Sequence, residues 1–356
     1  MLRRGEVAAL SVVTEHAVET AARQAMATST TPGLAVALVH HGRVAWVKGY
    51  GLVGRVTREP VTRATRFQAA SVSKPVTAWG LLRVVEQGRI GLDEPVVGYL
   101  RRWHPPPSPF DANGITVRRL LSHTAGLSVH GYAGLTPERP LPSIAASLSG
   151  EAVGSFPVEL LEAPGRGWLY SGGGYSVLQL LVEEVTSRPF AEFMQAEVLG
   201  PLGMNASSFR WRRTPATAFP HDAGGGRIPD FAFAEEAAAG LVTTAFDLAR
   251  FVAAALPGPQ GEPPGRRVLS PSGVRLALTA APATDGCWGL GYGLGLLLGG
   301  DLLAYHEGAN RGWRAGLALL PERRAGIVVL ANGDDGSVPI DAVVQQWLAL
   351  VPGTQE

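Results

Sequence analysis

The chain has 356 residues, of which 31 are Lys or Arg, 30 are Asp or Glu, and 46% are hydrophobic. A chain of this length buries roughly three-quarters of its unfolded surface, so it accommodates one large domain or two lobes. The net charge of +1 gives no electrostatic sign of a nucleic-acid partner. The single cysteine, Cys287, excludes an intramolecular disulfide scaffold and any multi-cysteine metal site.

The N-terminal residues do not read as an export signal. Residues 1–4 carry positive charge, but the apolar stretch 7–13 is short and is followed closely by Glu15 and His16. No segment approaches the ~18 unbroken apolar residues of a membrane span. We therefore expect a cytoplasmic protein with no membrane partner, whose first helix covers residues 12–26.

Two β-rich runs, 34–39 and 44–47, flank a Gly-containing turn and predict a hairpin. Helical spacing dominates the middle of the chain. The predicted helices are 76–85, 116–121 with Thr116 as its cap, 175–185, 190–199, and 246–255 with Asp247 near its start.

The C-terminal part returns to short apolar runs bounded by turn residues. They predict strands at 292–298, 302–306, 313–320 and 326–330, followed by a helix over 340–351. Strands at both ends of the chain with helices between them favour an α+β fold, with one antiparallel sheet built from both termini. The expected organisation is a sheet lobe from 1–75 and 236–356, and a mainly helical lobe from 76–235.

The basic residues are almost all arginine, since Lys48 and Lys74 are the two lysines among 31. Because arginine supplies nearly all of the positive charge, a lysine in such a chain indicates a specific chemical role for its amine. Unlike arginine, lysine can lose its proton when it is desolvated, and it can then act as a base.

Lys74 follows Ser71 by three residues, so on a helix the two side chains share a face. A neutral Lys74 could take or relay the proton of Ser71, which is the arrangement of an activated nucleophile. The helix start would also favour a developing anion. The alternative is that Ser71 or Ser73 merely caps the helix.

The segment Phe67–Ala78 resembles the nucleophile segment of the serine β-lactamase and penicillin-binding protein superfamily. It is most similar to the class C β-lactamase-related branch, which includes esterases and D-amino-acid peptidases. Further similar segments follow in order: Gly88–Val96, Leu120–Leu127, Tyr170–Tyr175, Ala239–Ala249 and His306–Gly308. The resemblance spans about residues 34–335 and implies the β-lactamase/transpeptidase fold.

The resemblance implies a role for each matching residue. Ser71 would form an acyl-enzyme, Lys74 would hold the proton network, and Tyr170 would be the general base or its partner. The backbone N–H groups of Ser71 and Ala309 would form the oxyanion hole. Whether Lys74 or Tyr170 takes the proton stays open, because coupled groups titrate as a pair.

Two positions depart from the family pattern. Gly172 stands where the family has the asparagine of Tyr-x-Asn, and His306 stands where it has the lysine of Lys-Thr-Gly or a His-x-Gly variant. Histidine is mostly neutral at pH 7, so a carboxylate of the substrate would lose a partner. Arg311 and Arg314 are candidate replacements for that lysine, and Asn310 is a candidate for the lost amide contact.

The expected function is a serine hydrolase that acts through Ser71 on carboxylic esters or small amides. The expected substrate-binding residues are His306, Gly308, Asn310 and Trp313, and Trp168, Trp288 and Tyr292 are either pocket or core residues. No cofactor and no metal are expected. The alternatives are a class C-type β-lactamase or D-amino-acid peptidase, and a non-catalytic penicillin-binding-like module. The oligomeric state stays open.

Overall fold

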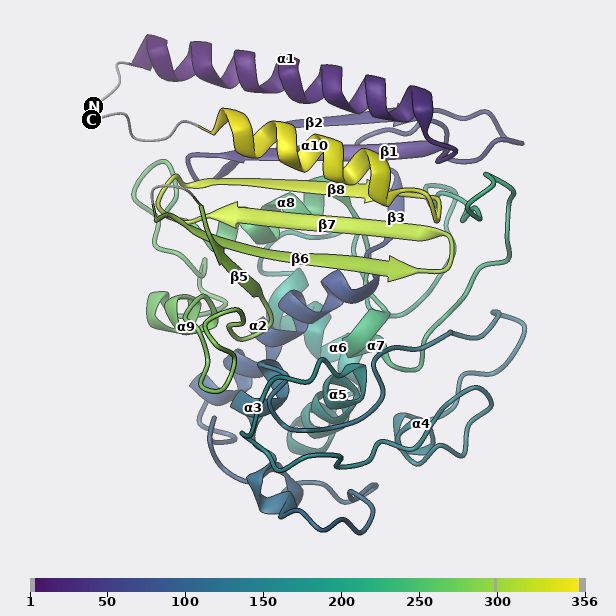
Figure 1. Ribbon diagram of the computed structural model, residues 1–356, viewed down its shortest axis with the longest axis vertical. Helices are drawn as coiled ribbons and strands as arrows, with labels where there is room; N and C mark the ends of the chain where they lie inside the picture. Colours follow the sequence, from purple (N-terminus) through teal and green to yellow (C-terminus); the bar gives the residue numbers. More distant parts are fainter. Residues whose placement is uncertain (1–3, 298–299, 352–356) are drawn as a thin grey trace.

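The computed structural model describes residues 4–297 and 300–351, and its centre is a six-stranded antiparallel sheet (Figure 1). The strand order is β2-β1-β8-β7-β6-β5. The strands are β1 (Gly33–His40), β2 (Arg43–Gly51), β5 (Gly293–Leu296), β6 (Leu302–Asn310), β7 (Trp313–Leu320) and β8 (Ala325–Ala331). Because β1 pairs with β8, strands from the two ends of the chain lie next to each other within one sheet, which confirms the expected α+β class.

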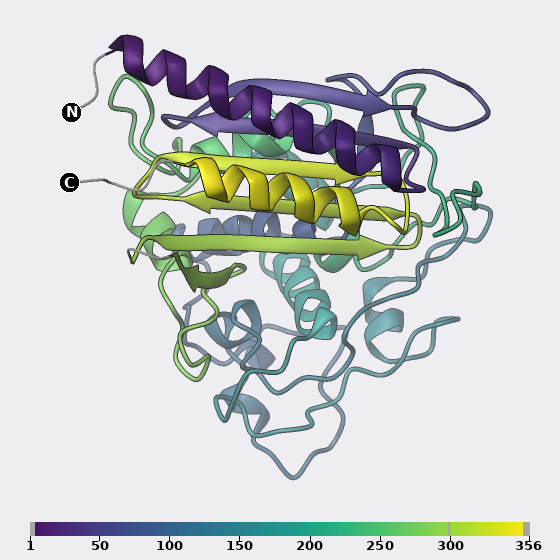
Figure 2. The ribbon, with the colours of Figure 1, turned by 45° about the horizontal axis from the view of Figure 1, so that its top comes forward.

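Helices α1 (Arg4–Thr28) and α10 (Ser337–Leu350) lie side by side across one face of the sheet (Figures 1 and 2). The buried residues of this layer include Val18 of α1 and Trp347 of α10. Strand β1 is buried on both faces, with Leu34, Val36 and Leu38 toward these helices. This double burial explains why β1 is a continuous apolar run rather than an alternating one.

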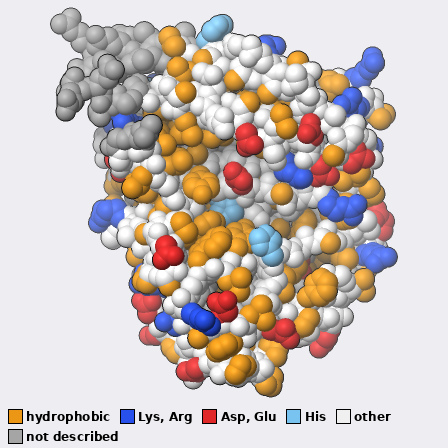
Figure 3. Space-filling model, in the orientation of Figure 1, with side chains coloured by type: hydrophobic (Ala, Val, Ile, Leu, Met, Phe, Trp, Pro, Cys, Tyr) orange, Lys and Arg blue, Asp and Glu red, His pale blue; other side chains and the backbone are white. Residues whose placement is uncertain are grey.

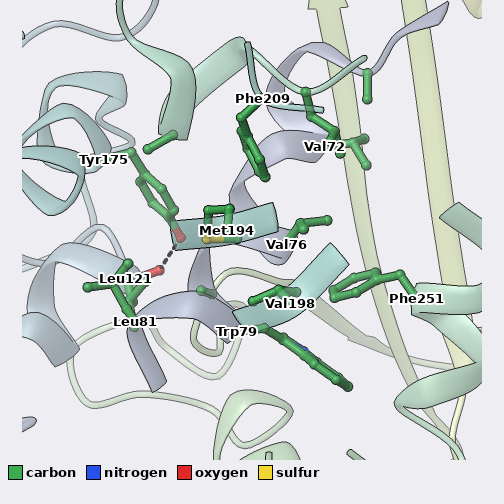
Figure 4. Close-up of a cluster of buried hydrophobic side chains, with 14 of the residues drawn as sticks. Val72, Val76, Trp79, Leu81, Leu121, Tyr175, Met194, Val198, Phe209 and Phe251 are labelled. Atoms are coloured by element: carbon green, nitrogen blue, oxygen red, sulfur yellow. Dashed lines mark hydrogen bonds between the residues drawn. The ribbon is translucent and has the colours of Figure 1, made fainter. Parts of the chain in front are cut away.

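The other face of the sheet packs on α8 (Ala245–Ala254) and on the helical part of the chain. The remaining helices are α2 (Ser73–Glu86), α3 (Val117–Leu121), α4 (Ile144–Leu148), α5 (Gly172–Thr186), α6 (Phe190–Met194), α7 (Glu236–Ala239) and α9 (Pro271–Ala277). Figure 4 shows the buried side chains around α2, where Trp79 packs on Phe251 at 4.9 Å between ring centroids. The Tyr175 hydroxyl donates to the Leu121 carbonyl at 3.0 Å. The first contact holds α2 against α8, and the second joins α5 to α3.

The predicted hairpin and helices are confirmed, with shifted ends. Helix α1 is longer than predicted and includes residues 7–13, whereas residues 1–3 lie outside the described residues. The predicted strand 292–298 shortens to β5, and position 298 lies outside the described residues. Helix 190–199 continues beyond α6 as a π-helical turn, Gln195–Leu199. The lobe boundaries at 75/76 and 235/236 stay a prediction.

A short two-stranded sheet was not predicted from the sequence. It pairs β3 (Arg66–Gln68) with β4 (Val242–Thr244), and it places β3 just before the turn that carries Ser71. Each strand has three residues, which is too short for an alternating pattern. Along residues 4–297 and 300–351, no helix has the length and apolar character that crossing a membrane requires.

Candidate active site

Ser71 lies in a 3₁₀ turn, Ala70–Val72, directly before α2, and Lys74 lies in the first turn of that helix. The Lys74 Nζ donates to Ser71 Oγ at 3.1 Å and to the Ala238 carbonyl at 2.9 Å. The Lys74 side chain is deeply buried, at 2% exposure. In the described part of the chain, no carboxylate lies within ion-pair distance of this ammonium. The predicted proximity of the two side chains is therefore confirmed.

The capping alternative is wrong for both serines. Helix α2 has Val72 at its N-cap and no side-chain cap. The Ser73 hydroxyl instead donates to the Ala70 carbonyl at 2.6 Å and accepts from the Leu241 N–H at 2.9 Å. Ser73 thus anchors the turn, which leaves the hydroxyl of Ser71 directed at Lys74.

Helix α7 holds the site through its main-chain carbonyls. Its last carbonyls have no partner within so short a helix. The carbonyl of Ala237 accepts from Thr77 Oγ1 at 3.0 Å, and that of Ala238 accepts from Lys74 Nζ at 2.9 Å. The carbonyl of Ala239 accepts from Asn310 Nδ2 at 3.3 Å. One four-residue helix thereby ties α2 to the end of β6. Sequence reasoning missed this role, since alanine side chains carry no chemical signal.

The first residue of α7, Glu236, is half-buried. Burial raises its pKa to about 8 from 4.5, although the charge of Arg210 opposes the shift. Between these pH values the unfolded chain loses this proton and the folded chain keeps it, so the free energy of unfolding falls as pH rises.

We expect Glu236→Gln to be more stable than the parent protein, by a margin that grows from pH 5 to pH 8. The growth is at most ~1.4 kcal/mol for each pH unit. Urea unfolding at both pH values measures it, with Glu322→Gln at an exposed position as the control. An equal margin at pH 5 and pH 8 would contradict the expectation.

Tyr170 lies half-buried beside these groups, and the Lys74 Nζ is 5.0 Å from the centroid of its ring. His123 stacks on the same ring at 4.2 Å, and its Nδ1 accepts from the Ser171 N–H at 3.1 Å. Burial and the charge of Lys74 hold the pKa of His123 well below its usual range, so the imidazole is neutral. His123 thus contacts one face of the Tyr170 ring and also holds the main chain at the next residue, Ser171.

The end of β6 lies against the turn that carries Ser71. A Cβ on Gly308 would be 2.4 Å from the Ala69 carbonyl oxygen and 3.1 Å from the Ser71 nitrogen, so only glycine fits there. Residues 311–312 form the turn to β7, which closes on the pair of Asn310 and Trp313. Because bonded pairs alternate along an antiparallel ladder, the N–H of Ala309 points away from β7, toward the free edge of the sheet.

A cavity of about 850 Å³ runs along this edge, with Ser71, Lys74, Tyr170, His306, Gly308 and Asn310 in its wall. Figure 3 shows a hollow below the sheet where hydrophobic and histidine side chains gather. Trp168 and Trp288 also line it, whereas Tyr292 is buried and accepts from Trp79 at 3.2 Å.

Trp313 was wrongly expected to bind substrate. Its side chain is completely buried, at 0% exposure, and its ring packs edge-on against Phe67 at 6.0 Å. Strand β7 is buried on nearly all of its residues, so the sequence pattern does not reveal which side chains face the cavity.

The polar residues near Ser71 supply little positive charge. Burial, with the charge of Lys74 adding to it, lowers the pKa of His306 to about 3, so this imidazole is neutral, as expected. The Asn310 amide donates to Gln68 Oε1 at 2.9 Å, so its NH₂ group is already engaged.

The side chains of Arg311 and Arg314, the candidate replacements for the lysine of the family pattern, both contact other residues. Arg314 pairs with Asp334 at 2.8 Å, and Arg311 stacks on Phe231 at 4.5 Å.

The model of the family described as Beta-lactamase matches residues 18–349. The chain belongs to the beta-lactamase family. Its curated relatives include the esterase EstB of Burkholderia gladioli, 34% identical over 204 residues that cover 53% of this chain and 50% of EstB. Protein flp of Staphylococcus aureus is 25% identical over 321 residues, which cover 86% of this chain and 61% of flp. The match thus spans only half to three-fifths of these relatives.

Solved structures have the same fold. The penicillin-binding protein homologue from Pyrococcus abyssi, described as octameric, has a TM-score of 0.77 at 24% identity and covers 94% of this chain and 76% of its own. SurE has a TM-score of 0.78 at 26% identity, with 96% and 76% covered. The Beta-Lactamase/D-Alanine Carboxypeptidase from Pseudomonas syringae has a TM-score of 0.75 at 20% identity, with 95% and 99% covered.

Proposed function

We propose that the protein is a serine hydrolase that forms an acyl-enzyme on Ser71 and acts on carboxylic esters or small amides. The observation that carries the proposal is the 3.1 Å contact between Lys74 Nζ and Ser71 Oγ at the wall of the cavity. A hydroxyl becomes a nucleophile at neutral pH only beside a group that can accept its proton, and the proposed reaction assigns that part to the Lys74–Tyr170 pair. Membership of a family with an esterase relative supports the same reaction class.

In the proposed reaction, Ser71 Oγ attacks the carbonyl carbon of the substrate while its proton passes to the Lys74–Tyr170 pair. The tetrahedral oxyanion is stabilised by the N–H groups of Ser71 and Ala309. When the intermediate collapses, the pair returns the proton to the leaving alcohol or amine. Water then attacks the acyl-enzyme with the same pair as base, which releases the acid and restores Ser71.

The preference for esters or small amides follows from what surrounds Ser71. A Cβ on Gly172 would be 2.9 Å from the His130 carbonyl oxygen, so no longer amide side chain fits at that position. The neutral His306 offers no charge to a substrate carboxylate. Both features remove contacts that an acylamido substrate with a carboxylate would use.

The proposal is tested with a fluorophosphonate probe and a panel of p-nitrophenyl esters of different chain lengths. We expect the probe to label the protein, ester hydrolysis to be measurable, and both to be lost in Ser71→Ala. Thr77→Ser is a conservative control because it keeps a hydroxyl opposite the Ala237 carbonyl. A folded protein that is neither labelled nor active on any substrate would instead favour a non-catalytic module.

The second candidate function is a β-lactamase or a D-amino-acid peptidase. Two similar structures favour it, one of SurE with D-Leu and the other of a Beta-Lactamase/D-Alanine Carboxypeptidase. Nitrocefin and D-alanyl peptides added to the ester panel separate the two. Nitrocefin turnover at rates that match ester hydrolysis would overturn the ester preference.

A further inference from the structure

The cavity continues beyond Ser71, across the free edge of β6, to the first turn of α10. Glu307 of β6 and Asp341 of α10 both line this outer part. Glu307 lies opposite Gly316 in the sheet, and a Cβ on Gly316 would be 3.1 Å from Ile340 Cγ2. Helix α10 therefore passes directly over this part of the sheet and brings Asp341 to the same wall as Glu307.

The outer part of the cavity has an excess of negative charge. Arg314 lines it, but its guanidinium is paired with Asp334 at 2.8 Å. Among the described residues, the carboxylates of Glu307 and Asp341 have neither an ion-pair nor a hydrogen-bond partner. The carboxylates of Glu307, Asp341 and Asp334 thus outnumber the single guanidinium of Arg314. Those of Glu307 and Asp341 are available to bind a ligand.

Other groups in the cavity wall also lack a partner within the described chain. His306 Nε2 and Trp288 Nε1 are unpartnered, although the two side chains are only 4% and 9% exposed. Buried polar atoms normally have a partner, so these two, which lie beside Tyr170, indicate that a substrate or water occupies the inner part of the cavity next to Ser71. The ring of Tyr305 is on the same strand face as Glu307 and is also in the wall. Aromatic faces beside free carboxylates attract cations.

We propose that the outer part of the cavity, lined by Tyr305, Glu307 and Asp341, binds a cationic group of the substrate. The substrate class is an ester or small amide that carries an ammonium group on either side of the bond that is cleaved. This inference rests on the proposed function, because it places the reacting carbonyl at Ser71. A carboxylate at the same position would meet two like charges.

The test compares substrates that differ only in charge. The acyl series consists of the p-nitrophenyl esters of 4-(trimethylammonio)butanoate, of its neutral isostere 5,5-dimethylhexanoate, and of glutarate with one free carboxylate. The leaving-group series compares acetylthiocholine with 3,3-dimethylbutyl thioacetate. We expect kcat/KM for the cation to exceed that for the neutral isostere by on the order of tenfold in at least one series. We expect the glutarate ester to be the poorest of its series.

Charge-removing variants show whether the two carboxylates cause the preference. We expect the ratio of cationic to neutral kcat/KM to fall about threefold in Glu307→Gln and in Asp341→Asn, and to approach one in the double variant. The ratio is measured within one preparation, so it does not depend on the folded fraction. The matched control, Glu322→Gln, removes an exposed carboxylate outside the cavity wall and keeps the parent ratio.

The outcomes separate this inference from the proposed function. Hydrolysis of the neutral esters with no preference for the cation in either series overturns the cationic subsite and leaves the serine hydrolase standing. A preference that persists in the double variant also overturns it. Absence of both fluorophosphonate labelling and hydrolysis of every ester overturns the proposed function instead.

Discussion

Lys74→Arg is expected to lower kcat/KM for esters by on the order of 10³-fold and to abolish labelling by a fluorophosphonate. Arginine keeps the positive charge but does not release its proton in a protein, so the hydroxyl of Ser71 loses its acceptor. The larger guanidinium also has to fit a site that is only 2% exposed. Lys74→Met, which is similar in length and uncharged, therefore accompanies it and is expected to be equally inactive.

The control for this prediction is the other lysine in the chain. Lys48 pairs with Glu19 at 2.5 Å on the sheet side, and Lys48→Arg keeps both the charge and the pairing. We expect that variant to retain parent activity. Activity close to that of the parent protein in folded Lys74→Arg, judged by circular dichroism and thermal unfolding, would remove lysine from the proposed mechanism.

Gly308→Ala is expected to reduce kcat/KM at least ~10²-fold while the protein still folds. The added Cβ would lie 2.4 Å from the Ala69 carbonyl oxygen, which is backbone and has no rotamer to change. Strand β6 and the turn that carries Ser71 would have to separate, which moves the Ser71 hydroxyl, the proposed nucleophile, away from the N–H of Ala309. Relief of this overlap is also expected to cost ~1–3 kcal/mol of stability, measured by urea unfolding.

Gly295→Ala provides the matched control in the neighbouring strand β5. A Cβ at that position has no neighbour within 4 Å, and its backbone does not have a positive φ. We expect parent activity and stability there. If Gly308→Ala also behaves like the parent protein, close contact between β6 and the Ser71 turn is not needed for the reaction.

The fold and the central pair of the site were predictable for local reasons. Ser71 and Lys74 are three residues apart, so a helix alone brings their side chains together. The strands that form the sheet are short apolar runs between turn residues, and such runs are visible in the sequence wherever both faces are buried. The hairpin of β1 and β2 needed only adjacent residues.

The parts that were missed depend on contacts between distant segments. Trp313 and Trp168 have the same chemistry in the sequence, yet one is in the core and the other is in the cavity wall. The choice depends on which side of β7 packs against Phe67, and β7 has too little polar alternation to indicate it. The carboxylate of Asp341 reaches the cavity only because α10 crosses the sheet, which no local pattern specifies.

The hydrogen bonds to the main-chain carbonyls of α7 have a consequence for which substitutions the site can accept. The Lys74 ammonium, the Thr77 hydroxyl and the Asn310 amide are all held by carbonyl oxygens of consecutive alanines. Every amino acid supplies the same carbonyl, so drift in the side chains of residues 237–239 leaves this scaffold intact provided that the helix persists. Ala238 and Ala239 also line the cavity. Larger residues there would reshape the cavity while the hydrogen bonds to Lys74, Thr77 and Asn310 remain. This pair of positions is therefore a suitable starting point for altering selectivity by directed evolution.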